Sequence, residues 1–133
     1  MIAVLDENLA KQIATALRAL GKQAIHVTEP EGPGRGTDDL ALFRWLGGKG
    51  SEWCLITQDI AQTRRVAEYQ AMRSHRLAVF VIEQKRHGPL TVFECGTLLI
   101  NMWPQIEVEM RKTNRPLVMT LSKGQRSLRP LRP

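Results

Sequence analysis

The sequence is short of aromatic residues, cysteines and long apolar runs, and each shortage argues against one class of protein. Aromatic residues make up only 5% of the chain, too few for a surface of several platforms that stack the bases of single-stranded nucleic acid. The two cysteines, Cys54 and Cys95, form no zinc-ligand pattern and are expected to be reduced core residues. No apolar run is long enough to cross a membrane, and no signal sequence opens the chain. We therefore expect a cytoplasmic protein without membrane contact.

Acidic residues are absent from the C-terminal end. Residues 1–109 contain 12 Lys and Arg and all 13 Asp and Glu, whereas residues 110–133 contain seven Lys and Arg and no acid. The formal net charge of +6 therefore belongs to this end of the chain. A nearly neutral body with a cationic tail is compatible with a metal-using enzyme that acts on a polyanion, and equally with a globular protein that carries a solvated tail.

The length and the apolar content predict one compact domain followed by a tail. With 133 residues, of which 43% are apolar, the chain can form one hydrophobic core. We assign residues 1–121 to this domain and residues 122–133 to a basic, flexible tail, because Lys, Arg, Pro, Gly and Ser predominate there. The sequence shows no internal repeat.

Short apolar runs alternate with helical patterns, which indicates an α/β domain with a mainly parallel sheet. The expected strands cover residues 2–5, 23–27, 53–57, 77–82 and, at an edge of the sheet, 117–121. The expected helices cover residues 9–20, a segment capped by Thr37 with Leu40, Phe43 and Leu46 buried, residues 60–73, and a segment with Leu90, Phe93, Thr97 and Ile100 on one face. Pro104 then either kinks this last helix or starts a new one. His26 lies within a strand, where we expect a hydrogen-bonded structural histidine.

Carboxylates follow two of the expected strands at the point where each strand ends. Asp6 comes directly after the first strand, and Asp59 follows the third. In an open parallel sheet, ligands bind in the crevice beyond the carboxyl ends of the strands. For Asp6 alone, turning the chain and capping the next helix is the simpler interpretation. The repetition of the pattern at Asp59 favours a shared site.

A second acidic pair begins a helix after a loop rich in Gly and Pro. Asp38 and Asp39 either complement the helix dipole or face Asp6 across the crevice. The loop itself is no Walker A motif, because it lacks a Gly-Lys-Ser/Thr ending. Several carboxylates in one crevice would repel each other unless a cation lay between them, and their oxygen atoms suit Mg²⁺ or Mn²⁺ better than zinc.

These stretches resemble the PIN-like nucleases, the branch with VapC-type toxins and short stand-alone PIN-like proteins. The resemblance covers residues 1–83 and is carried by Val4–Leu9, by the loop that leads to the second acidic pair, and by Leu55–Asp59. It implies a three-layer, Rossmann-like α/β fold with a mainly parallel sheet of four to five strands. It also implies an acidic pocket that binds Mg²⁺ or Mn²⁺ and hydrolyses RNA phosphodiester bonds.

The resemblance assigns roles to individual residues. The implied catalytic acids are Asp6, Asp38, Asp39, Asp59 and Glu68, and the implied metal ligands among them are Asp6, Asp38 and Asp59. The fourth acid of the family pattern is not evident, so either Glu68 substitutes for it or the site holds one metal ion. Arg64 and Arg65 are expected to bind the substrate phosphate, since a guanidinium matches it with two hydrogen bonds; ordinary surface charge, including an ion pair between Arg64 and Glu68, is the alternative.

A VapC-like role would make the chain the toxin of a toxin–antitoxin pair, with RNA and a cognate antitoxin protein as partners and a homodimer as a further candidate assembly. Two other classes are compatible with the sequence. One is a weakly active or inactive PIN-like protein that binds RNA or a protein through its basic end. The other is a doubly wound phosphatase, but Asp6-Glu7-Asn8 lacks the second aspartate, two positions on, that such enzymes use. We therefore expect a metal-dependent ribonuclease.

Overall fold

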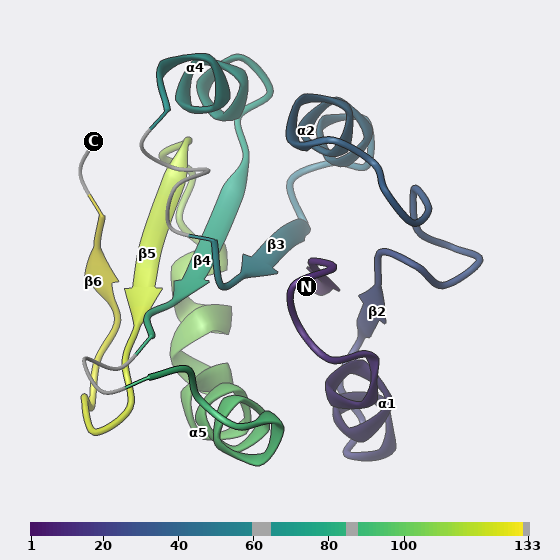
Figure 1. Cartoon of the computed structure of the whole chain (residues 1–133). Coiled ribbons are helices and arrows are strands. Elements are labelled where there is room, and N and C mark those ends of the chain that lie inside the picture. Colours follow the sequence, from purple (N-terminus) through teal and green to yellow (C-terminus); the bar gives the residue numbers. More distant parts are fainter. Residues whose placement is uncertain (60–64, 85–87, 132–133) are drawn as a thin grey trace.

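The computed structural model of the protein describes residues 1–59, 65–84 and 88–131. Over these residues the chain forms one six-stranded sheet with helices on both faces (Figure 1). The strands are β1 (Ile2–Leu5), β2 (Ala24–His26), β3 (Trp53–Thr57), β4 (Ala78–Ile82), β5 (Leu117–Leu121) and β6 (Arg129–Pro130). The helices are α1 (Lys11–Ala19), α2 (Asp39–Gly47), α4 (Val66–Ser74) and α5 (Val92–Met110).

The strand order is β2-β1-β3-β4-β5-β6. The pairs from β2 to β5 are parallel, and only β6 runs antiparallel to its neighbour. The predicted three-layer α/β architecture with a mainly parallel sheet is therefore confirmed, with one strand more than the four or five expected. In the β1–β3 register Leu5 lies beside Ile56, so the residues that follow these two strands emerge next to each other at the carboxyl edge of the sheet.

The two faces of the sheet have separate hydrophobic cores. Side chains on one face of the strands, such as Leu5, Ile56 and Phe80, pack under α1 and α5. Those on the other face, such as Val4 and Leu55, pack under α2 and α4. Burial on both faces explains why these strands appear in the sequence as continuous apolar runs.

Helices α1 and α4 end with the same hydrogen-bond pattern but with different residues at its centre. After α1 the N–H of Lys22 donates to the carbonyl of Leu17, and Gly21 between them has φ +82°. After α4 the N–H of Leu77 donates to the carbonyl of Met72, and the residue between them is Arg76 with φ +52°. This Schellman motif usually has Gly at the left-handed position, because a side chain there costs about 1–2 kcal/mol.

The start of α2 differs from the prediction. Thr37 does not cap this helix: its hydroxyl donates to the carbonyl of Gly34 (2.8 Å), and Asp38 is the N-cap, accepting from the N–H of Ala41 (2.8 Å). Thr37 fails as a cap because its hydroxyl is used to close the preceding loop. The helix consequently begins one residue later than expected, and Leu40 is 43% exposed while Leu42 is buried.

Helix α5 is continuous, so Pro104 lies inside it and starts no new helix. A capping box fixes its start, with the side chains of Thr91 and Glu94 each accepting from the other residue's backbone N–H (3.1 and 3.0 Å). The apolar residues whose spacing indicated this helix do not all face the core, because Phe93 is 81% exposed and Ile100 is 41% exposed. Apolar residues occur on more than one side of this helix, and the face centred on Leu99 and Ile106 is the one that packs on the sheet.

The C-terminal segment also differs from the prediction. Strand β5 is flanked by β6 and is not an edge strand in the described part of the chain. Leu128 and Leu131 pack against the two cores, and Gln105 of α5 donates to the carbonyl of Arg126 (2.6 Å). Two leucines spaced among basic residues were too weak a pattern to predict that the C-terminal segment packs against the domain and adds β6 to the sheet. The division of the chain at residue 121 stays a prediction. None of the described helices combines the length and apolarity needed to span a membrane.

Candidate functional site

The buried hydroxyl of Thr57 connects the ends of β1 and β3. It donates to Oδ2 of Asp6 (2.9 Å) and accepts from the side-chain amide of Asn8 (3.0 Å) and the backbone N–H of Asp59 (3.0 Å). A threonine hydroxyl has one donor and two acceptor positions, so all of them are used. Asp6 and the backbone of Asp59 are thus held by one hydrogen-bond network, although they are far apart in the sequence.

Asn8 completes this network. Its side-chain amide also donates to Oδ2 of Asp6 (3.3 Å), and its side-chain oxygen accepts from the backbone N–H of Gln58 (3.0 Å). The second oxygen of Asp6 accepts from the backbone N–H of Glu7 (2.7 Å). Asp6 is only 8% exposed, so its carboxylate has a fixed orientation toward the remaining open space.

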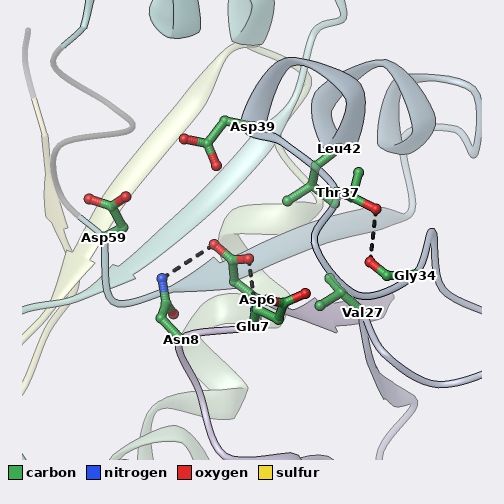
Figure 2. Close-up of a pocket in the computed structure, with 9 residues that line it drawn as sticks. All are labelled: Asp6, Glu7, Asn8, Val27, Gly34, Thr37, Asp39, Leu42 and Asp59. Atoms are coloured by element: carbon green, nitrogen blue, oxygen red, sulfur yellow. Dashed lines mark hydrogen bonds between the residues drawn. The ribbon is translucent and has the colours of Figure 1, made fainter.

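That open space is a cleft of about 400 Å³ at the carboxyl edge of the sheet. Figure 2 shows that Asp39 enters it from the start of α2, opposite the strand ends that carry Asp6 and Asp59. The cleft is lined by Asp6, Glu7, Asn8, Val27, Gly34, Thr37, Asp39, Leu42 and Asp59. Three carboxylates from three separate segments of the chain, together with Glu7, therefore give it a strongly acidic lining.

The Gly-rich loop holds α2 close to the end of β1. A Cβ atom on Gly32 would lie 2.5 Å from the carbonyl oxygen of Val27, so no larger residue fits there without a backbone shift. The N–H of Gly34 donates to the same carbonyl (2.9 Å), and the N–H of Gly36 donates to the carboxylate of Glu7. This close approach places the first turn of α2, and with it Asp39, over Asp6.

Arg65 provides a positive charge among these acids. Its guanidinium lies within ion-pair distance of Asp39 (3.7 Å), Asp59 (3.6 Å) and Glu68 (3.2 Å). This guanidinium offsets part of the repulsion between the acids, and the expected divalent cation stays a prediction. Arg64, the other arginine expected to bind phosphate, lies outside the described residues.

Two of the predicted acids are placed differently from the other three. The Asp38 side chain is exposed and folds back onto its own helix as the N-cap. Glu68 extends from α4 to Arg65 and does not line the cleft. Asp39, rather than Asp38, is consequently the acid that faces Asp6.

The cleft has the right ligand chemistry for a hard divalent cation, because carboxylate oxygens are the atoms that Mg²⁺ and Mn²⁺ prefer. Its acids do not converge on a single point, however. Among the described residues, no three His, Cys, Asp or Glu side chains form a ready-made metal-binding group. Binding of an ion would require Asp6, Asp39 and Asp59 to converge and Arg65 to move away from Asp39 and Asp59.

Thr57 and Asn8 are site residues that were not predicted from the sequence. The available signal was their spacing, since each lies two residues from a strand-end aspartate, in Thr57-Gln58-Asp59 and in Asp6-Glu7-Asn8. His26, in contrast, is structural as expected. Its ring nitrogens contact the hydroxyl of Thr28 (2.7 Å) and the carbonyl of Leu9 (2.8 Å).

The cysteines are free and buried, as predicted. Complete burial raises the pKa of Cys54 to about 12. Burial also raises the pKa of Cys95, although its sulfur accepts a hydrogen bond from Gln58 (2.9 Å) that acts in the opposite direction. Since the thiolate is the reactive form, neither thiol is suited to act as a nucleophile.

A family model described as "PIN like domain" matches residues 1–84. The chain belongs to the PIN-like domain family. PIN-like domains are of nuclease type, so the chain is a nuclease-type protein at the level of its family. The match spans β1 to β4 and therefore includes every residue of the acidic cleft. No curated protein and no solved structure matches the chain.

Proposed function

We propose that this PIN-like protein is a metal-dependent endoribonuclease that hydrolyses RNA phosphodiester bonds in the acidic cleft. The observation that carries the proposal is the meeting of Asp6, Asp39 and Asp59 in one cleft within the part of the chain that matches the family. Such a cluster lowers the stability of the folded protein unless a cation offsets its charge, because like charges repel at short range. The position of the cluster in a crevice at the carboxyl ends of the strands favours a function.

Asp6, Asp39 and Asp59 are the residues that would hold Mg²⁺ or Mn²⁺. A bound divalent ion supplies electrostatic stabilisation of a phosphate in an in-line displacement and makes water more acidic. The carboxylate of Asp6 is already oriented for such a role, because Thr57, Asn8 and the backbone of Glu7 hold it.

Arg65 is proposed to bind the phosphate of the substrate. Its contacts with Asp39 and Asp59 are long, and the side chain is 52% exposed, so each of these ion pairs contributes little to stability. The guanidinium can therefore exchange its carboxylate partners for a phosphate at small cost. Arg64 is retained in the same proposed role on the sequence alone.

The decisive experiment is RNA cleavage by the purified chain with Mg²⁺, with Mn²⁺ and with EDTA. We expect cleavage with either ion and none in EDTA. Asp59→Asn protein, which keeps the shape of the side chain but loses its charge, is expected to be folded and inactive. Cleavage that persists in EDTA, or in folded Asp59→Asn protein, would assign the activity to another site or to a contaminant.

A toxin of a toxin–antitoxin pair is the biological role we propose, acting on RNA in the cytoplasm, with a homodimer as a candidate assembly. The position of Arg65 supports an antitoxin that inserts a basic side chain, because a guanidinium already fits between these acids. Expression in bacteria should arrest growth, and Asp59→Asn should relieve the arrest. Normal growth with well-expressed, cleavage-competent protein would exclude this role.

The second candidate function is a PIN-like binding module with weak or no catalysis. It is favoured by the separation of the acids, since the described residues contain no ready-made metal group and Arg65 contacts two of the three cleft aspartates. Such a protein would bind RNA or a protein partner without cleaving RNA. The cleavage experiment distinguishes the two candidates directly.

A further inference from the structure

A second cavity, of about 390 Å³, lies at the opposite edge of the sheet. This is the edge where β3 and β4 begin and where α2, α4 and α5 end. Its lining includes several basic residues: His75, Arg76, Arg111, Lys112 and Arg115. We call it the basic pocket.

Three arginines of the basic pocket have no acidic partner among the described residues. Throughout the described ranges, no carboxylate lies within 4.0 Å of the guanidinium of Arg76, Arg111 or Arg115. Lys112, in contrast, pairs with Glu109 (3.0 Å). The pocket therefore concentrates positive charge that no direct ion pair among the described residues neutralises, although Glu52 and Glu107 line a neighbouring cavity with Arg111.

The three guanidinium groups differ in how many donors they have left. Arg115 uses its donors to cap the end of α5, bonding the carbonyls of Met110 (3.2 Å) and Lys112 (2.7 Å). Burial lowers the pKa of Arg115, and the like charge of Arg76 acts in the same direction. Among the described residues the side chain of Arg76 makes a single long hydrogen bond, to the carbonyl of Thr113 (3.4 Å), and both Arg76 and Arg111 are exposed. Arg76 and Arg111 are thus the residues with donors available for a ligand.

Arg76 occupies the backbone position at which α1 has Gly21. Both residues have positive φ at the centre of the same helix-ending motif. Glycine adopts this conformation without strain, whereas arginine does not. Backbone strain at a solvent-exposed residue whose side chain has no acidic partner in the described chain points to a use for that side chain.

Helix α2 connects the basic pocket with the acidic cleft. Asp39 at its start lines the cleft, and Gly47 at its end lines the pocket. Nine residues of α-helix span about 13 Å, a distance that a few nucleotides of single-stranded RNA can cover. The exposed side chain of Arg44 lies between the two ends.

We propose that the basic pocket binds backbone phosphates of an RNA strand whose scissile bond lies in the acidic cleft. That the bound RNA is also the substrate rests on the proposed function. The positive charge of the pocket is independent of that function. Nucleic acid is the ligand favoured by the lining, because the wall that carries these arginines also includes the indole of Trp53. Cations combined with an aromatic surface are typical of single-strand binding grooves.

The test measures binding of a fluorescein-labelled, mixed-sequence single-stranded RNA to full-length Asp59→Asn protein in EDTA over a salt series. The test variant is Arg76→Asn/Arg111→Gln, in which Asn tolerates the positive φ and both charges are lost. Two matched variants control it: Arg76→Lys/Arg111→Lys keeps both charges, and Lys11→Gln/Lys22→Gln removes two charges beside α1. Thermal melting of each variant shows that it is folded.

Two phosphate contacts contribute about 1.4 to the slope of log affinity against log salt. This slope corresponds to a fall in RNA affinity of about sevenfold between 50 and 200 mM salt. We expect the test variant to lose up to this slope and both controls to keep it. Equal slopes for the test variant and the Lys11→Gln/Lys22→Gln variant would overturn the proposal. Displacement of the RNA by poly-L-glutamate at equal charge concentration would overturn it in favour of an acidic protein partner.

Cleavage by the otherwise wild-type chain, with and without Arg76→Asn/Arg111→Gln, is measured separately. RNA binding that depends on Arg76 and Arg111 in a protein without cleavage supports the basic pocket and contradicts only the proposed function. Cleavage together with binding that is indifferent to both arginines contradicts only the basic pocket.

Discussion

The two edges of the sheet carry opposite charge, and part of this difference follows from the fold itself. In the parallel part of the sheet, α2 begins at the carboxyl edge, while α2, α4 and α5 end at the opposite edge. Helix starts favour negative side chains and helix ends favour positive ones, by about 0.3–1 kcal/mol each. Asp38 at the start of α2 and Arg115 at the end of α5 fit this explanation, because each directly bonds the terminus beside it.

Other charged residues at the two edges are not explained by the helix ends, and these residues are the better evidence for a functional site. At the carboxyl edge Asp6 and Asp59 follow strands, and Asp39 faces the cleft. At the opposite edge Arg76 and Arg111 bond no helix terminus with their side chains within the described chain, and Arg76 has a strained backbone. The sign of the charge at an edge is therefore weak evidence for a site, whereas a charged side chain that bonds no helix terminus is stronger evidence.

The largest expected effect separates the two neighbouring aspartates at the acidic edge. Asp39→Asn should reduce RNA cleavage by about a hundredfold or more, the usual cost of removing one group that stabilises a transition state electrostatically. Asp38→Asn should leave cleavage nearly unchanged, because asparagine is an equally good N-cap. Initial cleavage rates at saturating Mg²⁺ compare them. Equal losses in both variants would show that net charge at this edge, and not the position of Asp39, determines activity.

The next largest effect is expected at Thr57, whose hydroxyl connects the ends of β1 and β3. Thr57→Val keeps the shape of the side chain but leaves Asp6 and Asn8 without their shared partner, so the free energy of unfolding should fall by about 1–3 kcal/mol. Thr120→Val is the matched control on β5, since Thr120 is also buried but, within the described chain, its hydroxyl makes only one long hydrogen bond, to the carbonyl of Arg129 (3.4 Å). Urea denaturation measures both. A larger loss at Thr120 would contradict the role given to the Thr57 network.

Much of the acidic edge could be predicted from sequence because its positions are set locally. Asp6 and Asp59 directly follow apolar runs, and parallel strands end at the same edge. The choice between Asp38 and Asp39 depended on a shift of one residue at the start of α2, which the hydroxyl of Thr37 decided. The contact between Asp6 and Thr57 depended on the register of β1 and β3, which no local pattern contains.

The basic pocket could not be predicted from the sequence. The cationic residues from 110 onward appeared in the sequence only as one basic C-terminal end, and nothing there indicated that Arg111 and Arg115 line a cavity beside the end of α5. Arg76 comes from a different element, and its positive φ cannot be inferred from an arginine in a sequence. Only the ends of α4 and α5, placed together by the fold, bring these charges into one pocket.

A smaller effect tests whether the acidic edge binds a metal ion. Mg²⁺ or Mn²⁺ at ten times its Kd should raise the free energy of unfolding by about 1.4 kcal/mol, because the unfolded chain cannot assemble the acids. Arg65→Gln should increase this shift at a given ion concentration, since it removes the cation that now lies beside Asp39 and Asp59. Thermal melting over a metal titration measures both. Equal shifts in wild-type and Asp59→Asn protein would show that the ion binds elsewhere.

The smallest expected effect is a change in stability at Arg76, in the basic pocket. Arg76→Gly should stabilise the protein by about 0.5–1 kcal/mol, because relief of the left-handed strain exceeds the entropy that glycine loses on folding. Gly21→Arg is the reciprocal variant; nothing lies within 4 Å of a Cβ atom at Gly21, so its expected destabilisation comes from the backbone alone. Chemical denaturation gives both values. If Arg76→Gly raises stability and also weakens RNA binding at low salt, then arginine at this position costs the fold stability and benefits the ligand site. A destabilised Arg76→Gly protein would instead show that the side chain supports the fold, and the strain would lose its value as evidence for the basic pocket.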